Sequence, residues 1–225
     1  MRKLALAAGV SLAVIACSAP TEGRGPRGLK PTANPSAVIA TELAFARAAQ
    51  EKGQWTAFDQ YAADDAIMFV PQPTPAKAWL KKRANPAVAV KWQPYEVWMS
   101  CDGSLAVTKG AWQRPENVGY FTTVWRRQKN GTFKWVLDQG DTLKEPLPAP
   151  EMISGQVAEC SPRPGAAGGA ESAAAAANDA RGGASDDDTL IYSTDVGSDG
   201  SRTFKVLRWT GSGYEEALRS DVAGG

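Results

Sequence analysis

Carboxylates are the side chains best suited to chemistry in this chain of 225 residues. The sequence has no histidine, which excludes the usual zinc sites, the Ser-His-Asp triad and the commonest general base. Its three cysteines, at positions 17, 101 and 160, have no metal-ligand spacing. Phosphate-binding and dinucleotide-binding glycine motifs are also missing from the sequence. We therefore expect neither a metal site nor a cofactor.

Asp138 is the best candidate for a general base. It lies well inside a predicted core strand, as does Glu96, but Glu96 should face Lys109 across a neighbouring turn and pair with it. A two-residue turn at Asn130-Gly131 would place Asp138 opposite Thr123. A carboxylate there could abstract a proton from a bound molecule. The alternative is a structural Asp that is hydrogen-bonded by Thr123 or by backbone, or that lies near a solvated rim.

The strands that position this residue are predicted by the segment from Gly119 to Asp141. Asn-Gly between two β-branched and aromatic runs is a strong hairpin signal, because both turn residues must accept positive φ. The resulting register pairs Trp125 with Val136, and it leaves large apolar groups on both faces. We expect this hairpin to lie in the middle of a curved sheet. The side chains expected to border a pocket, if they do not simply fill the core, are Phe69, Tyr95, Trp112, Thr123, Trp125, Asp138 and Gln139.

Helices precede this sheet. A cap at Asn34 and an apolar stripe that includes Ile39 and Leu43 predict a helix over 35–52. The order of elements indicates an α+β fold in which the helices lie on one face of a bent antiparallel sheet. After the first helix we expect a short helix over 55–61, a strand over 66–70, a short helix from 75, and four consecutive antiparallel strands between 95 and 141.

The motif G-x-W-x-x-F-x-x-Y-A-x-D-D-A, which starts at Gly53, carries a family resemblance. Together with Gly119 to Asp141 it resembles the nuclear-transport-factor-2-like superfamily, which includes ketosteroid isomerase, the polyketide-cyclase-like (SnoaL-like) proteins and a large branch of unknown function. That last branch is the best match. The resemblance covers about Pro35 to Leu143 and implies a cone-shaped domain over 34–145, with a pocket at its open end. It also implies a possible homodimer, because relatives often dimerise through the sheet.

The positions that carry the family's isomerase chemistry are changed in this chain. The resemblance implies an Asp base directly before Pro71 and an oxyanion-binding Tyr seven residues before Gly53, and these positions hold Val70 and Ala46. Many relatives also have His where this chain has Gln139. We therefore expect a non-catalytic cone that binds a small apolar molecule or a protein partner. The alternative is a cofactor-free isomerase, cyclase or hydratase that uses Asp138 as its base.

The N-terminus predicts export. Residues 1–16 have a basic start and an apolar run too short to span a bilayer, as a secretory signal has. The run ends in Val-Ile-Ala-Cys17, which resembles a bacterial lipobox; an incidental cysteine after an ordinary signal is the alternative. A lipid on Cys17 would anchor the protein on the periplasmic side of a membrane, with 17–33 as a tether, and Ser18 suggests the outer membrane. Cys101 and Cys160 would then form a disulfide, if they are not two free thiols.

The C-terminal third predicts a linker over 146–188 and a three-stranded β-meander over 189–225. Three acidic residues at 186–188 lack calcium-ligand spacing, and we expect them to be a solvated charge run. A sheet this small is marginal alone, so it should dock on the cone, on a partner or on another copy. The net charge of +1, without any basic block, argues against nucleic acid as a partner.

Overall fold

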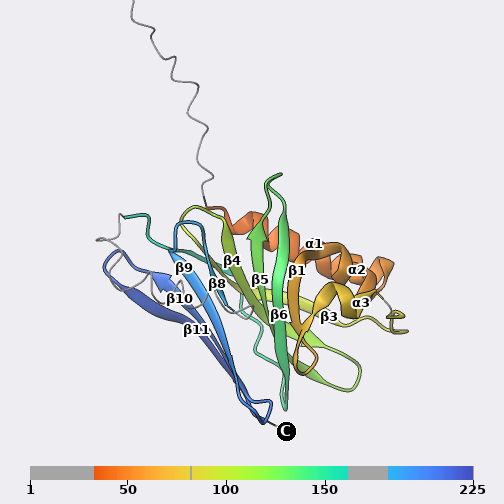
Figure 1. The fold of residues 1–225 in the computed structure, drawn as a ribbon. Helices are drawn as coiled ribbons and strands as arrows, with labels where there is room; N and C mark the ends of the chain where they lie inside the picture. The colour runs from red at the N-terminus through yellow and green to blue at the C-terminus, as the bar shows by residue number, and fades with distance from the viewer. Residues whose placement is uncertain (1–32, 82, 162–181, 225) are drawn as a thin grey trace, which may run out of the picture.

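The computed structural model describes residues 33–81, 83–161 and 182–224, which form two sheets and three helices. A curved seven-stranded sheet carries the helices on one face, and a four-stranded antiparallel sheet lies against the other face (Figure 1). This is the α+β cone with an additional C-terminal sheet that the sequence predicts. The predicted signal sequence, Cys17 and nearly all of the tether lie outside the described residues. Within the described ranges, none of the helices has the length and apolar character needed to cross a bilayer.

The helices are α1 (Pro35–Lys52), α2 (Gln54–Tyr61) and α3 (Ala76–Leu80). The side chain of Asn34 caps α1, as predicted, by accepting a hydrogen bond from the N–H of Ala37. Gly53 between α1 and α2 has a φ of 97° and no side chain to offer as a cap. Asn85 caps α2 instead, because its Oδ1 accepts the N–H of Trp55 at 2.7 Å.

The seven-stranded sheet has the order β2-β1-β6-β5-β4-β3-β7. Strands β3 to β6 are consecutive and antiparallel, as the sequence predicts. At the two ends, β1 runs parallel to β6 and β7 runs parallel to β3, so the sheet is mixed where we expected an antiparallel one. These pairings join strands distant in the chain, and no turn motif specifies them. The strands are β1 (Ala62–Phe69), β2 (Pro73–Pro75), β3 (Lys91–Met99), β4 (Leu105–Gln113), β5 (Val118–Arg127), β6 (Phe133–Leu143) and β7 (Ser154–Val157).

The β5–β6 hairpin keeps the predicted register at its centre and departs from it near the turn. Thr123 lies opposite Asp138, as expected. A bulge then pairs Trp125 with Trp135, where Val136 was expected. The turn is longer than two residues, and only its glycine, Gly131, has positive φ. The prediction was therefore right for the pair that matters to the site and wrong for the turn type.

The C-terminal sheet has four strands, one more than predicted. Strands β9 (Leu190–Val196), β10 (Arg202–Trp209) and β11 (Tyr214–Val222) match the expected meander, and β8 (Gly183–Ala184) adds a short edge. Buried side chains of this sheet, including Tyr192 and Phe204, share one apolar cluster with Val124 and Leu137 of the cone. Of the three docking sites that the sequence left open, the structure shows the first. The sheet docks on the cone.

The segment expected to be a linker contains regular structure in its described parts, which include β7 and β8. Cys160, just beyond β7, forms a disulfide with Cys101 at the end of β3. The acidic residues at 186–188 belong to a hydrogen-bonded turn between β8 and β9 and are not a free charge run. No group of three or more His, Cys, Asp or Glu in the described ranges is arranged to hold a metal ion.

Two turns of the same construction face each other beside the disulfide, and we call them the paired turns: residues 100–105 and 185–190. Both read Ser-x-Asp-x-Ser/Thr-Leu. In each, the Asp side chain accepts both the N–H and the hydroxyl of the residue two positions later, Ser104 or Thr189. The turns also bond each other reciprocally, since the N–H of Cys101 donates to Thr189 and that of Asp186 donates to Ser104, both at 2.9 Å. The two sheets are therefore joined by a symmetric contact at this end.

Candidate functional site

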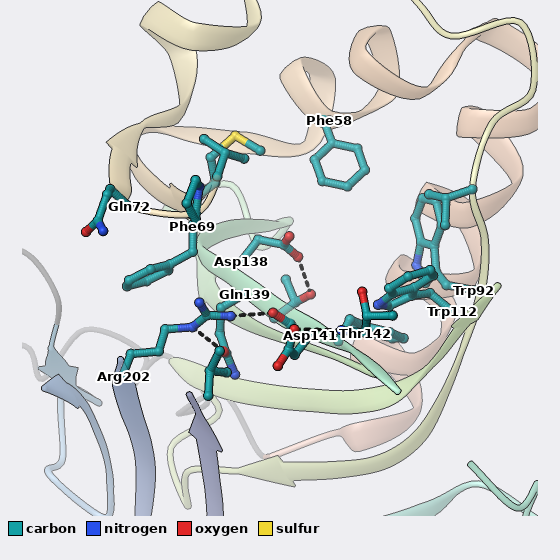
Figure 2. Close-up of a pocket in the computed structure, with 18 of the residues that line it drawn as sticks. Phe58, Phe69, Gln72, Trp92, Trp112, Asp138, Gln139, Asp141, Thr142 and Arg202 are labelled. Atoms are coloured by element: carbon teal, nitrogen blue, oxygen red, sulfur yellow. Dashed lines mark hydrogen bonds between the residues drawn. The ribbon is translucent and has the colours of Figure 1, made fainter. Parts of the chain in front are cut away.

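A cavity of about 680 Å³ opens between the helices and the concave face of the seven-stranded sheet, and its mouth reaches the C-terminal sheet (Figure 2). Most of its lining is aromatic or apolar, and the polar groups are few. The apolar side chains come from α1, α2, β1, β3, β4, β5 and β11 and the segments beside them: Phe45, Trp55, Phe58, Met68, Phe69, Val70, Pro71, Val90, Trp92, Trp112, Phe121, Val222 and Ala223.

Five of the seven predicted pocket residues line this cavity: Phe69, Trp112, Thr123, Asp138 and Gln139. Trp125 is fully buried beside it. Tyr95 lines a separate, smaller depression of about 210 Å³, because β3 has a bulge between Pro94 and Glu96. The bulge reverses the alternation of side chains, so Pro94 lies opposite Gly110, where Tyr95 was expected, and Trp92 is the β3 side chain that lines the cavity.

Asp138 lies on the inner face of β6 and points toward Phe58 (Figure 2). Its Oδ2 accepts a hydrogen bond of 2.8 Å from the hydroxyl of Thr123. The side chain is half-buried, and it contributes to the cavity lining. Burial raises the pKa of Asp138 to about 7, against the opposing effect of the Thr123 hydrogen bond, and the negative charge of Glu42 adds to the rise. This carboxyl can therefore gain or lose a proton near neutral pH.

Glu42 is a fully buried carboxyl behind the cavity wall. Its Oε1 accepts the indole N–H of Trp92 at 2.8 Å, and its Oε2 accepts the Thr108 hydroxyl at 2.6 Å and the indole N–H of Trp125 at 3.0 Å. Burial raises the pKa of Glu42, and the three hydrogen bonds oppose that shift. This network holds both indole rings in place, so Glu42 shapes the cavity wall without lining it.

Arg202 of β10 stands at the cavity mouth, on the side of β6 opposite to Asp138 (Figure 2). Its Nε donates to Oε1 of Gln139 at 3.1 Å, and its guanidinium also donates to the carbonyl oxygen of Gly140. The guanidinium lies 5.1 Å from the ring centre of Phe69. The amide nitrogen of Gln139 is buried and has no hydrogen-bond partner among the described residues. The C-terminal sheet therefore supplies part of the mouth.

Sequence reasoning missed Glu42, Trp92 and Arg202. Val38, Glu42, Phe45 and Ala49 follow helical spacing and make up most of the buried face of α1, whereas Leu43 of the expected stripe is exposed. The helical spacing of this buried face is visible in the sequence, but Glu42 interrupts its apolar pattern. No sequence pattern indicates that Arg202 lies at the cavity mouth, because its position depends on how the C-terminal sheet docks.

Neither a protein-family model nor a curated protein matches the sequence. Solved structures that resemble it include a ketosteroid isomerase-like protein from Parabacteroides distasonis, with 17% identity, coverage of 52% of this chain and 98% of that one, and a TM-score of 0.39. A protein of unknown function with a cystatin-like fold from Methylobium petroleophilum has 10% identity, coverage of 55% and 84%, and a TM-score of 0.38. An epoxide hydrolase from M. tuberculosis has 14% identity, coverage of 48% and 84%, and a TM-score of 0.35.

Each of these likenesses extends over about half of the chain, 48 to 55%. Identities of 10 to 17% and TM-scores below 0.4 give no ground for transferring an activity. What the cavity does must be argued from its own side chains.

Proposed function

We propose that the cone binds a small, largely apolar molecule in its cavity. The observation that carries this proposal is a cavity of about 680 Å³ lined mainly by aromatic and aliphatic side chains. Ligand-binding pockets are typically roughly 300 to 1,000 Å³, mostly apolar, with a few polar groups that fix orientation. Asp138 inside the cavity and Arg202 at its mouth are polar groups of that kind.

Proton transfer by Asp138 is the second candidate, because a pKa of about 7 suits a general base at neutral pH. Such a reaction also needs a donor to stabilise the developing oxyanion. The indole N–H groups of Trp92, Trp112 and Trp125 and the hydroxyl of Thr123 all donate within the protein. The amide nitrogen of Gln139, which has no partner among the described residues, belongs to the next residue along β6, whose side chain is directed to the other face of the strand. Binding therefore ranks above catalysis. If Asp138 is a true base, Asp138→Asn should lower the rate by roughly two to four orders of magnitude.

We further propose that the protein is exported and held through a lipid on Cys17 at the periplasmic side of the outer membrane. The lipobox-like residues 14–17 support this, and so does the Cys101–Cys160 disulfide, which suits an oxidising compartment. Metabolic labelling with a radioactive fatty acid should mark the wild-type chain and leave Cys17→Ser unmarked. A Cys17→Ser protein that still takes up label and stays with the membrane fraction would refute the anchor.

The binding proposal is tested with the neutral fluorophore N-phenyl-1-naphthylamine, which brightens in apolar surroundings. Val70 lines the cavity, so Val70→Trp should fill part of it and weaken binding by about tenfold or more. Val88→Trp is the matched control, because Val88 is exposed and does not line the cavity. Equal binding by both variants would show that the probe sits elsewhere, and a wild-type protein that binds no such probe would refute the proposal.

A further inference from the structure

Four hydrogen-bond donors in and behind the inner wall of the cavity are already used within the protein. The indole N–H groups of Trp92 and Trp125 donate to Glu42, and that of Trp112 donates to the carbonyl oxygen of Tyr120 at 2.9 Å. The hydroxyl of Thr123 donates to Asp138. A ligand that accepts hydrogen bonds would find none of these four donors free, whereas a ligand that donates them would find the carboxyl of Asp138.

Asp138 also lacks a positive partner. The Thr123 hydrogen bond is the one that the described residues give its carboxyl. Arg202 is held on the opposite face of β6 by Gln139 and Gly140. Arg114 lies over the ring of Trp112, 5.6 Å from its centre. A carboxylate enclosed among apolar groups is costly unless it is paired or protonated, so this one is suited to an incoming cation.

The walls around Asp138 favour a cation as well. Figure 2 shows Phe58 and Trp92 around the space that Asp138 faces, whereas the ring of Phe69 lies nearer to Arg202 at the mouth. The π faces of aromatic rings attract cations, and the attraction strengthens when water is excluded. Glu42, behind the wall on α1, adds negative potential that disfavours an anion in the same space.

We propose that the molecule bound in the cavity carries a protonated amine, which pairs with Asp138 while its apolar body contacts the surrounding rings. This inference rests on the proposed function, because it names the class of the ligand that the cavity binds. The amides of Gln54, Gln72 and Gln139 also line the cavity and could bind a neutral polar group instead. The test must therefore separate charge from polarity.

Three probes with one naphthalene body make this separation: 2-(1-naphthyl)ethylamine, the corresponding alcohol and 1-naphthylacetate. Their dissociation constants are measured by calorimetry on the full chain at about pH 8, where Asp138 is ionised and an alkylamine is still protonated. We expect the amine to bind about tenfold or more tightly than the alcohol, and the carboxylate to bind weakest. At about pH 5.5 Asp138 is protonated, and the advantage of the amine should shrink.

The other charged groups that line the described cavity are Arg114, Asp141, Asp199 and Arg202, and Glu42 lies behind it. Asp138→Asn separates their effect from that of Asp138. This variant should lose the preference for the amine and keep its affinity for the alcohol. Asp64→Asn, at an exposed position of β1, is the matched control and should bind all three probes as the wild type does. Thermal unfolding of both variants shows whether they fold.

The outcomes distinguish the two proposals. Equal binding of amine and alcohol at about pH 8, tightest binding of the carboxylate, or an amine preference that survives Asp138→Asn would overturn the amine inference and leave the apolar cavity standing. If none of the three naphthalene probes binds, and N-phenyl-1-naphthylamine does not bind either, the proposal that the cavity binds a small apolar molecule is refuted.

Discussion

Asp138 makes the stability of this protein depend on pH in an unusual direction for an acidic residue. Its pKa is about 7 in the folded chain, above the ordinary value of 3.8, so the folded state holds the proton more tightly than the unfolded state. The contribution is fully present below about pH 4 and is lost as pH rises through about 7. The loss is at most about 4 kcal/mol, less where solvent in the cavity screens the charge.

Asp138→Asn should therefore unfold less readily than the wild type at about pH 8, and the difference should close near about pH 4. Asparagine can still accept the hydrogen bond from Thr123, so the local packing is kept. Urea denaturation of both proteins across this pH range measures the difference. Parallel curves, with no pH-dependent gap between the two, would mean that the pKa of Asp138 is not raised.

Glu42 predicts a different mutational pattern. Glu42→Ala leaves Trp92, Thr108 and Trp125 without their common acceptor and opens a void, so it should cost about 3 kcal/mol or more of unfolding free energy. Glu42→Gln keeps one acceptor oxygen and should cost clearly less. The midpoints of urea unfolding compare the two variants. A glutamine variant as unstable as the alanine variant would show that the charge, and not hydrogen bonding, is what this position needs.

Residue by residue, the sequence predicted Thr123, Asp138 and Gln139 of the central hairpin, but not Phe121, which also lines the cavity. The pairing of Thr123 with Asp138 follows from side-chain alternation in two strands joined by a recognisable turn. Trp92 was missed because a bulge at Tyr95 reverses that alternation, and no residue type in the sequence predicts the bulge. Glu42 was missed because a buried acid looks like the polar face of a helix until its three donors are seen.

Among the elements, β3 and the chain after β7 are joined by the Cys101–Cys160 disulfide, whose cysteines are 59 residues apart. Closing a loop of this length should stabilise the fold by about 4 kcal/mol on the chain-entropy model. The double variant Cys101→Ser, Cys160→Ser should lose that amount, and wild-type protein in a reducing agent should unfold at the same midpoint as the variant. A wild-type midpoint that the reductant leaves unchanged would contradict this.

Strand order was predictable only where short turns connect neighbours. The run from β3 to β6 follows from such turns, and so do β9 to β11. The parallel pairs β1–β6 and β3–β7 join distant segments, and their stability comes from packing that local patterns do not encode. The short strands β7 and β8 lie in a stretch rich in Pro, Gly and Ala, whose composition favours a linker.

At the scale of the whole molecule, the C-terminal sheet covers the outer face of the cone. The family resemblance implies dimerisation through that sheet, but here the chain covers it with its own residues, including Tyr192 and Phe204. A homodimer of the intact protein would need another surface. The hydroxyl of Tyr120 on β5 also lies 2.7 Å from that of Ser220 on β11, so the cover is held by polar as well as apolar contacts.

Removal of residues 162–225 should therefore expose an apolar face on the cone. We expect the truncated protein to unfold at a lower temperature and to self-associate, which thermal denaturation and analytical ultracentrifugation measure. Arg219→Ala in the full chain is the control, because Arg219 is exposed and its salt bridges lie on the surface. A truncated chain that stays monomeric with an unchanged unfolding temperature would show that the cone is complete without the additional sheet.

The paired turns give this architecture a signature that can be read without coordinates. Two copies of Ser-x-Asp-x-Ser/Thr-Leu flank the long stretch between β4 and β9. A cysteine lies second in the first copy, and its disulfide partner, Cys160, lies in the stretch between the two copies. We expect another chain in which a cone motif is followed by this arrangement to hold a C-terminal sheet against its cone through the same pair of turns. This expectation does not require the rest of its sequence to resemble the present one.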